Sequence, residues 1–328
     1  MRKLKFVPLV LIVCSFAFAA DMRQVAVLDL PGRPGFDELA FAKGVLIISH
    51  PASNSVEIFD TVKRRPIGKI ADMSSPRGIA VNDDGSAVYI ANYAAGNIVE
   101  LDTNAWRVKR TIPVEGAPES LLLVPKSHIL LTTLPDKRQI AAVDLARGQQ
   151  IVAAPLDGRP ESLAFDTRRA MVYVTLLDGK KIIGFDNALR PAKAIPLNGS
   201  LPTGLVYDAK LDRLYVAVRY AVLALDPETG SEVSRVPVAG GIDHLALDDS
   251  SRTLFGVANG SVFLMRAEAR LGEPEEVSVD VKGHTMAFDP AKRLIYVPGG
   301  REGRSKLLIM KQVAPGTADS QNASIATK

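Results

Sequence analysis

Short runs of alternating apolar and polar residues recur along the chain, and turn-forming residues separate them. One set comprises residues 78–81, 87–92, 97–102 and 108–114, with turn sequences such as 82–85 and 94–96 between the runs. The runs are rich in β-branched and aromatic residues, which favours strands over helices. Residues 161–165, 171–175, 181–186 and 192–197 follow the same pattern. The hydrophobic pattern therefore predicts units of four short strands.

These units form a repeat of about 42 residues. Each of three columns of similar residues returns in one register. The proline column is Pro76, Pro118, Pro160 and Pro202, at steps of 42. The apolar column is Ile47, Tyr89, Leu131, Tyr173, Tyr215, Phe255 and Tyr296, at steps of 40 to 42. The acidic column is Asp60, Asp102, Asp144, Asp186 and Asp226, at steps of 42 and finally 40. A period of this length is typical of repeat architectures.

Seven units follow one another from Phe36 to about Gln312. The last unit offers only three strands, which end at residues 307–311, whereas residues 24–30 form a strand without a partner. A ring solves both problems, because the first strand can complete the last unit and no sheet edge stays open. We therefore predict an all-β fold, a seven-bladed β-propeller of four-stranded blades over residues 21–312, closed by its N-terminal strand.

The second strands of several units carry a related sequence, as in 88–92 (VYIAN), 172–175 (VYVT) and 214–217 (LYVA), and each is followed by a strand ending in Asp. Together with the Pro-x-Gly-Ile/Leu segments at Pro76 and Pro202, they resemble the YVTN-repeat (YncE-like) β-propeller family. The resemblance covers residues 23–312. It implies the propeller fold and little about chemistry. Units six and seven diverge most, with Arg266 and Lys311 where other units have Asp.

Residues 1–20 are typical of a cleaved secretory signal peptide: a cationic start, an apolar stretch over 6–18 and the small-x-small site Ala17-Phe18-Ala19. The apolar stretch is too short to span a membrane, so we expect no transmembrane segment in the mature form and a periplasmic or secreted location. Cleavage would remove Cys14, the only cysteine. Residues 313–328 lack any apolar period and are predicted to be a disordered tail.

The formal charge is +4, with 40 basic and 36 acidic residues. Three of the basic residues lie in the first twenty, so the rest of the chain carries only +1. Proteins that grip a phosphate backbone usually show a larger basic excess, so nucleic-acid binding is not expected. The chain also lacks a Gly-x-Ser-x-Gly elbow, a P-loop, a dinucleotide fingerprint and a Cys-x-x-Cys-His haem site.

The repeat register predicts which side chains gather at one mouth of the central channel, where propeller loops converge and ligands generally bind. The position after the proline column holds Asp37, Arg77, Glu119, Glu161, Thr203, Asp243 and His284. The ends of the second strands add His50, Asn92 and Asn259, with Tyr93 beside them. We predict that these eleven residues form a ligand-binding site. The acidic column and the repeated tyrosines, by contrast, are expected to stabilise turns and blade packing.

The chemistry of this ring leaves alternatives open. Several carboxylates around one channel raise the cost of ionisation or recruit a cation, which suits a divalent metal or a cationic or polyhydroxy ligand. Alternatively, Arg77 neutralises Asp37 and Glu119 and water fills the rest. A transition-metal site could use His50, Asp243, His244 and His284, although no two histidines have a short ligand spacing.

Three functions follow from these observations. The first is a non-enzymatic exported propeller without a required cofactor, which binds a small ligand or a protein partner at the channel mouth. The second is a divalent-metal-dependent hydrolase of the lactonase (gluconolactonase) type. Against it, the inner strands carry no Asn, because Asn92 and Asn259 lie one strand further out. The third is a nucleic-acid-binding propeller, which the small net charge disfavours.

Overall fold

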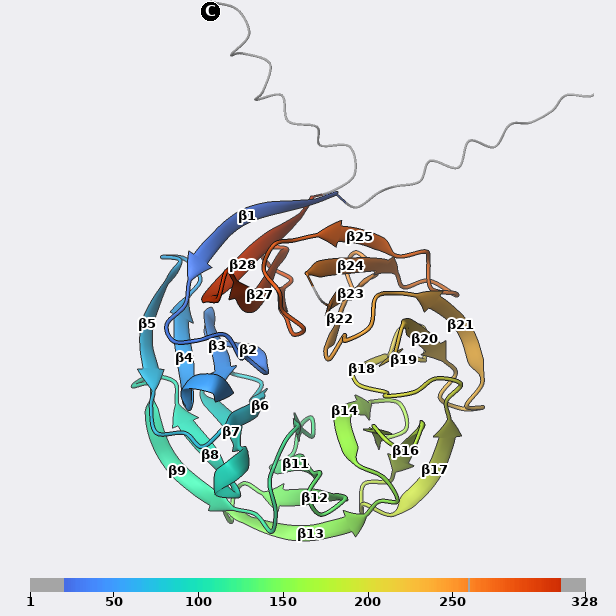
Figure 1. Cartoon of the computed structure of the whole chain (residues 1–328). Helices are drawn as coiled ribbons and strands as arrows, with labels where there is room; N and C mark the ends of the chain where they lie inside the picture. Colours follow the sequence, from blue (N-terminus) through green and yellow to red (C-terminus); the bar gives the residue numbers. More distant parts are fainter. Residues whose placement is uncertain (1–20, 259, 314–328) are drawn as a thin grey trace, which may run out of the picture.

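Seven four-stranded antiparallel sheets surround a central axis in the computed structural model, which describes residues 21–258 and 260–313 (Figure 1). We number the blades in chain order. Blade one comprises β2 (Leu39–Ala42), β3 (Val45–His50), β4 (Ser55–Asp60) and β5 (Arg65–Ile70), and blade two comprises β6 (Pro76–Val81), β7 (Ala87–Asn92), β8 (Asn97–Asp102) and β9 (Arg107–Pro113). Blade three comprises β10 (Leu121–Leu123), β11 (Ile129–Leu134), β12 (Gln139–Asp144) and β13 (Gln149–Pro155), and blade four comprises β14 (Pro160–Asp166), β15 (Met171–Leu176), β16 (Lys181–Phe185) and β17 (Pro191–Pro196).

The last three blades complete the ring. Blade five comprises β18 (Leu205–Asp208), β19 (Arg213–Val218), β20 (Ala221–Leu225) and β21 (Glu232–Pro237). Blade six comprises β22 (Leu245–Asp248), β23 (Thr253–Ala258), β24 (Ser261–Arg266) and β25 (Glu275–Ser278). Blade seven comprises β26 (Ala287–Asp289), β27 (Leu294–Arg301), β28 (Arg304–Val313) and β1 (Asp21–Asp29). Short 3-10 turns, η1 (Pro51–Ser53) and η2 (Tyr93–Ala95), follow β3 and β7. Among the described residues, no helix has the length and apolarity needed to cross a membrane.

The N-terminal strand closes the ring, as predicted. β1 runs antiparallel to β28, from Asp21 opposite Val313 to Asp29 opposite Lys306. In Figure 1 it lies outside β28, so the two ends of the described chain meet in blade seven. Met22 and Leu30 are buried against neighbouring strands. Closure therefore combines a backbone ladder with apolar packing, and it leaves the last blade with four strands like the others.

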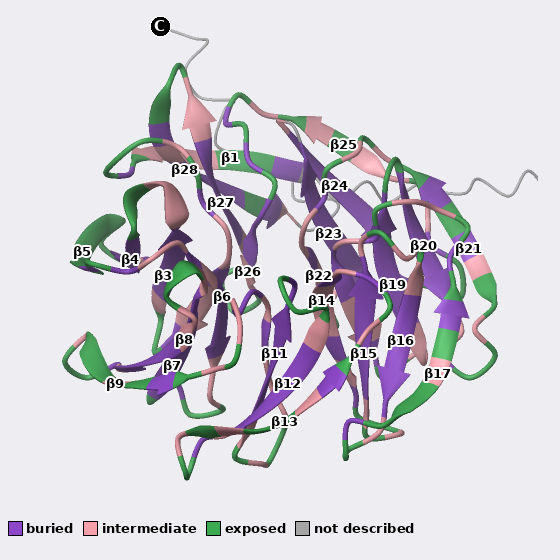
Figure 2. Cartoon of the chain, turned by 60° about the horizontal axis from the view of Figure 1, so that its bottom comes forward, coloured by how far each residue is buried: buried purple, intermediate pink, exposed green. Residues whose placement is uncertain are grey.

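The core consists of apolar layers between adjacent blades. Tyr215 of β19 packs with Leu254 and Phe263 of blade six in one such layer. Tyr173 of β15 packs in the same way against blade five. The second and third strands of each blade are mostly buried, the innermost strands are partly buried, and the outermost strands are largely exposed (Figure 2). The predicted packing role of the repeated aromatic residues is confirmed.

The acidic column stabilises turns after the third strands, as predicted. For example, Asp226 Oδ1 accepts backbone N–H bonds from Glu228 and Thr229, each at 2.8 Å. Asp60 accepts such bonds from Val62 and Lys63. These carboxylates satisfy donors that the tight turn would otherwise leave without partners.

Candidate functional site

The inner ends of the blades bring six of the seven register residues into one small cavity at the axis. Its volume is about 90 Å³. Its lining includes Asp37, Arg77, Glu119, Glu161, Asp243 and His284, together with Glu38, Gly78, Ser120, Ser162 and His244. The seventh register residue, Thr203, lines an adjoining pocket with Asp243. The 42-residue register thus places chemically different side chains at equivalent points around one axis.

Two arginines neutralise part of this ring. Arg77 Nη1 lies 3.0 Å from Asp37 Oδ2 and 3.3 Å from Glu119 Oε1, so it makes both ion pairs that the register suggested. Arg159 Nη2 approaches the other oxygen of Glu119 at 3.2 Å. The Arg77 guanidinium also lies 4.9 Å from the centre of the Tyr93 ring. Glu119 is therefore held between two guanidinium groups.

Three acids of the cavity, Glu161, Glu38 and Asp37, are harder to ionise than usual. Burial raises the pKa of Glu161 to about 7, and the nearby charge of Glu119 adds to the effect. Glu161 Oε2 is buried and has no hydrogen-bond partner in the described part of the chain. Burial raises the pKa of Glu38 to about 8, although Glu38 Oε2 accepts a 2.9 Å hydrogen bond from the Ile79 N–H. Burial also raises the pKa of Asp37, partly offset by Arg77.

The two histidines of the channel have opposite electrostatic environments. His284 Nδ1 lies 2.6 Å from Asp243 Oδ2, and this contact raises the pKa of His284. Burial lowers the pKa of His244, which lines the same cavity as His284. One imidazole is therefore biased toward the charged form and the other toward the neutral form.

The structure corrects the prediction for His50 and Asn92, whose side chains do not face a ligand. His50 is fully buried, stacked on Phe36 at 4.2 Å between ring centres, with Nδ1 at 3.1 Å from Glu57 and Nε2 at 2.8 Å from the Arg33 carbonyl. Asn92 Oδ1 accepts the Ser74 N–H at 2.6 Å. Other segments enclose both side chains: the segment before β2 together with η1 at His50, and the segment before β6 at Asn92. Asn259 lies outside the described residues.

The proposed metal ligand sets do not fit the geometry. His50 is committed to Glu57 and is not among the residues that line the axial cavity. Within residues 21–258 and 260–313, no group of three or more His, Cys, Asp or Glu side chains is arranged to hold a metal ion. Each oxygen of Glu119 already contacts a guanidinium. The cavity thus offers hydrogen-bond acceptors rather than a coordination shell.

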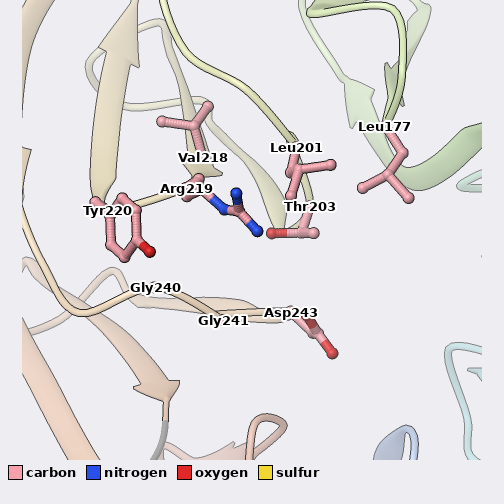
Figure 3. Close-up of a pocket in the computed structure, with 9 residues that line it drawn as sticks. All are labelled: Leu177, Leu201, Thr203, Val218, Arg219, Tyr220, Gly240, Gly241 and Asp243. Atoms are coloured by element: carbon pink, nitrogen blue, oxygen red, sulfur yellow. The ribbon is translucent and has the colours of Figure 1, made fainter.

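A second, larger pocket adjoins the cavity and shares Asp243 with it (Figure 3). Its volume is about 400 Å³, and its lining is Leu177, Leu201, Thr203, Val218, Arg219, Tyr220, Gly240, Gly241 and Asp243. Sequence reasoning named only Thr203 and Asp243 among these. It also missed Glu38, which directly follows the register residue Asp37, and Arg159, which lies two residues before the register residue Glu161. Adjacent polar residues at the channel end of each inner strand were the available signal.

Comparisons with known proteins support the architecture. No family model matches the chain. A dihydro-heme d1 dehydrogenase from Pseudomonas aeruginosa is 26% identical over 102 residues, which is 29% of this chain and 21% of that protein. This match therefore spans about a fifth of the relative's own length.

Two solved structures share the fold. Hydrazine synthase from Kuenenia stuttgartiensis has a TM-score of 0.75 at 15% identity, covering 87% of this chain and 97% of that one. Virginiamycin B lyase from Staphylococcus aureus also has a TM-score of 0.75, at 12% identity, covering 89% of this chain and 100% of that one. At this level of identity the likeness concerns the fold, and the chain is a seven-bladed β-propeller.

Proposed function

We propose that this protein is an exported propeller that binds a small polar ligand, through a cationic or hydrogen-bond-donating group, at its channel mouth. The observation that carries the proposal is Glu161 Oε2, a buried acceptor without a partner among the described residues. Leaving such an atom without a hydrogen bond costs about 1–3 kcal/mol. A donor from a ligand would remove that cost.

The charge balance of the cavity favours the same ligand class. Five carboxyl groups line it, those of Asp37, Glu38, Glu119, Glu161 and Asp243. Among the described residues, two guanidinium groups, from Arg77 and Arg159, and the His284 imidazole contact three of these acids. An ammonium group that entered would meet the acceptor oxygens of Glu38 and Glu161, which pair with no cation in that part of the chain, whereas a phosphate would meet cations that already pair with acids. Nucleic-acid binding at this mouth is therefore not supported.

Export rests on the sequence alone. The predicted signal peptide, residues 1–20, lies outside the described residues, as does most of the predicted tail at 313–328. The location we propose is periplasmic or secreted, because residues 1–20 carry the cationic, apolar and small-residue segments of a secretory signal in the right order.

The test is calorimetric titration of the mature protein with 1,4-diaminobutane at pH 6 and pH 8.5. The pKa of Glu161 is raised to about 7, so its carboxyl group is mostly protonated at pH 6 and ionised at pH 8.5. We expect affinity to rise by about tenfold between the two pH values. The isosteric variant Glu161→Gln should show a much smaller rise, because the Glu38 carboxyl, whose pKa is raised to about 8, still ionises in the same range. The control Glu268→Gln removes an exposed acid outside the channel and should leave the rise unchanged.

A folded protein that binds no diamine at either pH would contradict the proposal. So would equal binding by the wild type and Glu161→Gln. Far-ultraviolet circular dichroism of each variant separates loss of binding from loss of the fold.

A second candidate function, acid–base catalysis, is favoured by one feature of the same cavity. Glu161, with its pKa near 7, and the His284–Asp243 pair are suited to give or take a proton near neutral pH. The structural likeness to a lyase is compatible with this role. Hydrolysis of simple lactones that Glu161→Gln abolishes would support it, without the metal for which the described residues offer no ligand group.

A further inference from the structure

We propose that the pocket between blades four, five and six is a second binding site, and that it takes a small aromatic carboxylate. The pocket adjoins the axial cavity but has a different chemistry: an apolar floor, an exposed aromatic ring and a guanidinium (Figure 3). Its volume of about 400 Å³ falls in the range of small-molecule sites, roughly 300–1,000 Å³.

The floor and walls of the pocket are apolar. Leu177 follows β15 of blade four, Leu201 precedes β18, and Val218 ends β19. Leu201 is 38% exposed although it is a large aliphatic residue. These three side chains come from two blades and line one pocket, so a ligand ring seated there would bury apolar surface that now meets solvent.

Tyr220 supplies an aromatic wall at a conformational cost. It is the second residue of the two-residue turn between β19 and β20, with a φ of 66° and 64% of its surface exposed. The second residue of the corresponding turn is Gly260 in blade six and Gly303 in blade seven, at φ values of 85° and 74°. The left-handed region suits glycine and disfavours a bulky side chain. Blade five therefore holds an exposed ring where blades six and seven use glycine.

Gly240 fits this ring closely. A Cβ atom at Gly240 would lie 3.1 Å from Tyr220 Cε1 and 3.2 Å from Cδ1, closer than ordinary van der Waals contact. Because Gly240 has no positive φ, its lack of a side chain makes room for the ring rather than for a turn. The ring therefore lies between the Arg219 side chain and the loop that precedes β22.

Arg219 supplies the positive charge. Its guanidinium carbon lies 5.9 Å from the centre of the Tyr220 ring, and no carboxylate within the described residues pairs with it. Figure 3 shows its side chain extending toward Thr203, over the open part of the pocket. A planar guanidinium can bind a carboxylate with two parallel hydrogen bonds. The Arg219 end of this pocket is thus positive, whereas five carboxyl groups line the axial cavity.

Asp243 lines the inner end of the pocket and adds a hydrogen-bond acceptor. Its carboxylate accepts from His284, and its remaining lone pairs can accept an N–H or O–H donor of a ligand. The ligand that fits has a ring between two polar ends: a carboxylate toward Arg219 and a donor toward Asp243. Indole-3-acetate has this arrangement and serves as the probe.

The experiment is calorimetric titration of the mature protein at pH 7.5 with indole-3-acetate, indole-3-ethanol and tryptamine. The three share the indole ring and differ in charge. We expect indole-3-acetate to bind in a one-to-one complex about tenfold more tightly than either analogue. Arg219→Gln should remove this preference. Arg270→Gln, an exposed arginine outside the pocket lining, is the matched control and should bind like the wild type.

A second variant tests the aromatic wall. Tyr220→Asn keeps a residue that tolerates a positive φ, so we expect it to fold normally and to bind all three indoles about tenfold more weakly. Absence of indole-3-acetate binding by the folded wild type, or equal affinity for tryptamine, would overturn the proposal. So would an unchanged preference in Arg219→Gln. Glu161→Gln should leave indole-3-acetate binding intact, because Glu161 does not line this pocket. The titrations therefore test this pocket separately from the proposed function of the axial cavity.

Discussion

Glu38 is an acid in the channel wall without a cationic partner among the described residues, and Glu38→Gln should stabilise the protein at high pH. The raised pKa of its carboxyl group, about 8, arises mainly from burial, and the charge of Asp37 adds to the effect. The Ile79 N–H opposes the shift through its 2.9 Å hydrogen bond to Glu38 Oε2. Glutamine has nearly the same shape and keeps an oxygen for that N–H, but it never has to ionise.

The size of the expected gain in stability follows from the pKa shift of Glu38. A change of pKa from 4.5 to about 8 corresponds to about 5 kcal/mol at 1.36 kcal/mol per pKa unit. Glu38 is half-buried and keeps some access to the channel, where solvent screens its charge. We therefore expect the variant to gain about 2 kcal/mol at pH 8.5. For a domain of this size, that corresponds to a rise of about 4 °C in the unfolding midpoint.

The direction of the pKa shift of Glu38 determines the pH range in which this group affects stability. Between pH 4.5 and about 8 the folded protein retains a proton on Glu38 that the unfolded chain has released. The wild type therefore loses stability as pH rises through this window, and below pH 4.5 the group contributes nothing. The difference between Glu38→Gln and wild type should start near zero at pH 4 and grow up to pH 8.5. Glu161 titrates in the same range in both proteins, so it cancels in the difference.

Thermal unfolding followed by circular dichroism at pH 4, 5.5, 7 and 8.5 measures this difference. Glu268→Gln is the control, because Glu268 is exposed, and its midpoint should follow the wild type at every pH. A midpoint difference for Glu38→Gln that does not change with pH, or that is larger at pH 4 than at pH 8.5, would contradict the predicted cost of ionising Glu38.

Two further predictions concern the ring itself. Arg169 contacts Asp166 at 2.8 Å and Asp212 at 2.6 Å, and Asp166 is fully buried, so Arg169→Ala should cost about 3–5 kcal/mol in urea denaturation. A loss below about 1 kcal/mol, as for an exposed ion pair, would contradict this. Met22 of the closing strand is buried in the layer that contains Phe255, so Met22→Ala should cost about 2–3 kcal/mol. An unchanged denaturation midpoint would mean that β1 does not hold the ring closed.

The composition of the axial cavity could be predicted in part. A residue that follows the proline column lies at or just before the start of an inner strand, so Arg77 and Glu119 had to approach one another once the blades formed a ring. His50 and Asn92 could not be placed in the same way. Each ends a second strand, and its side chain bonds a segment outside the repeat columns, at Arg33 for His50 and at Ser74 for Asn92. The repeat columns do not predict these contacts.

The hairpin of blade seven shows the same limit. Residues 299–304 contain three glycines, which disfavour a strand, yet β27 continues to Arg301 and β28 begins at Arg304, leaving a two-residue turn. Gly299 and Gly300 pair with Lys306 and Ser305 within the sheet. Glycine weakens strand propensity, yet pairing along a long neighbouring strand outweighs it.

The seven blades and their closure could be predicted from the repeat pattern, because each unit carries its own strand and turn signals and the missing strand lies at the other end of the chain. The chemistry of the channel mouth, by contrast, depends on how the blades pack. The raised pKa values of Glu38 and Glu161 depend on burial by neighbouring blades, and the Arg219–Tyr220 pocket is built from non-repeating loops of three blades. Local patterns specify strands, whereas burial, charge pairing and pocket shape arise between segments that are distant in sequence.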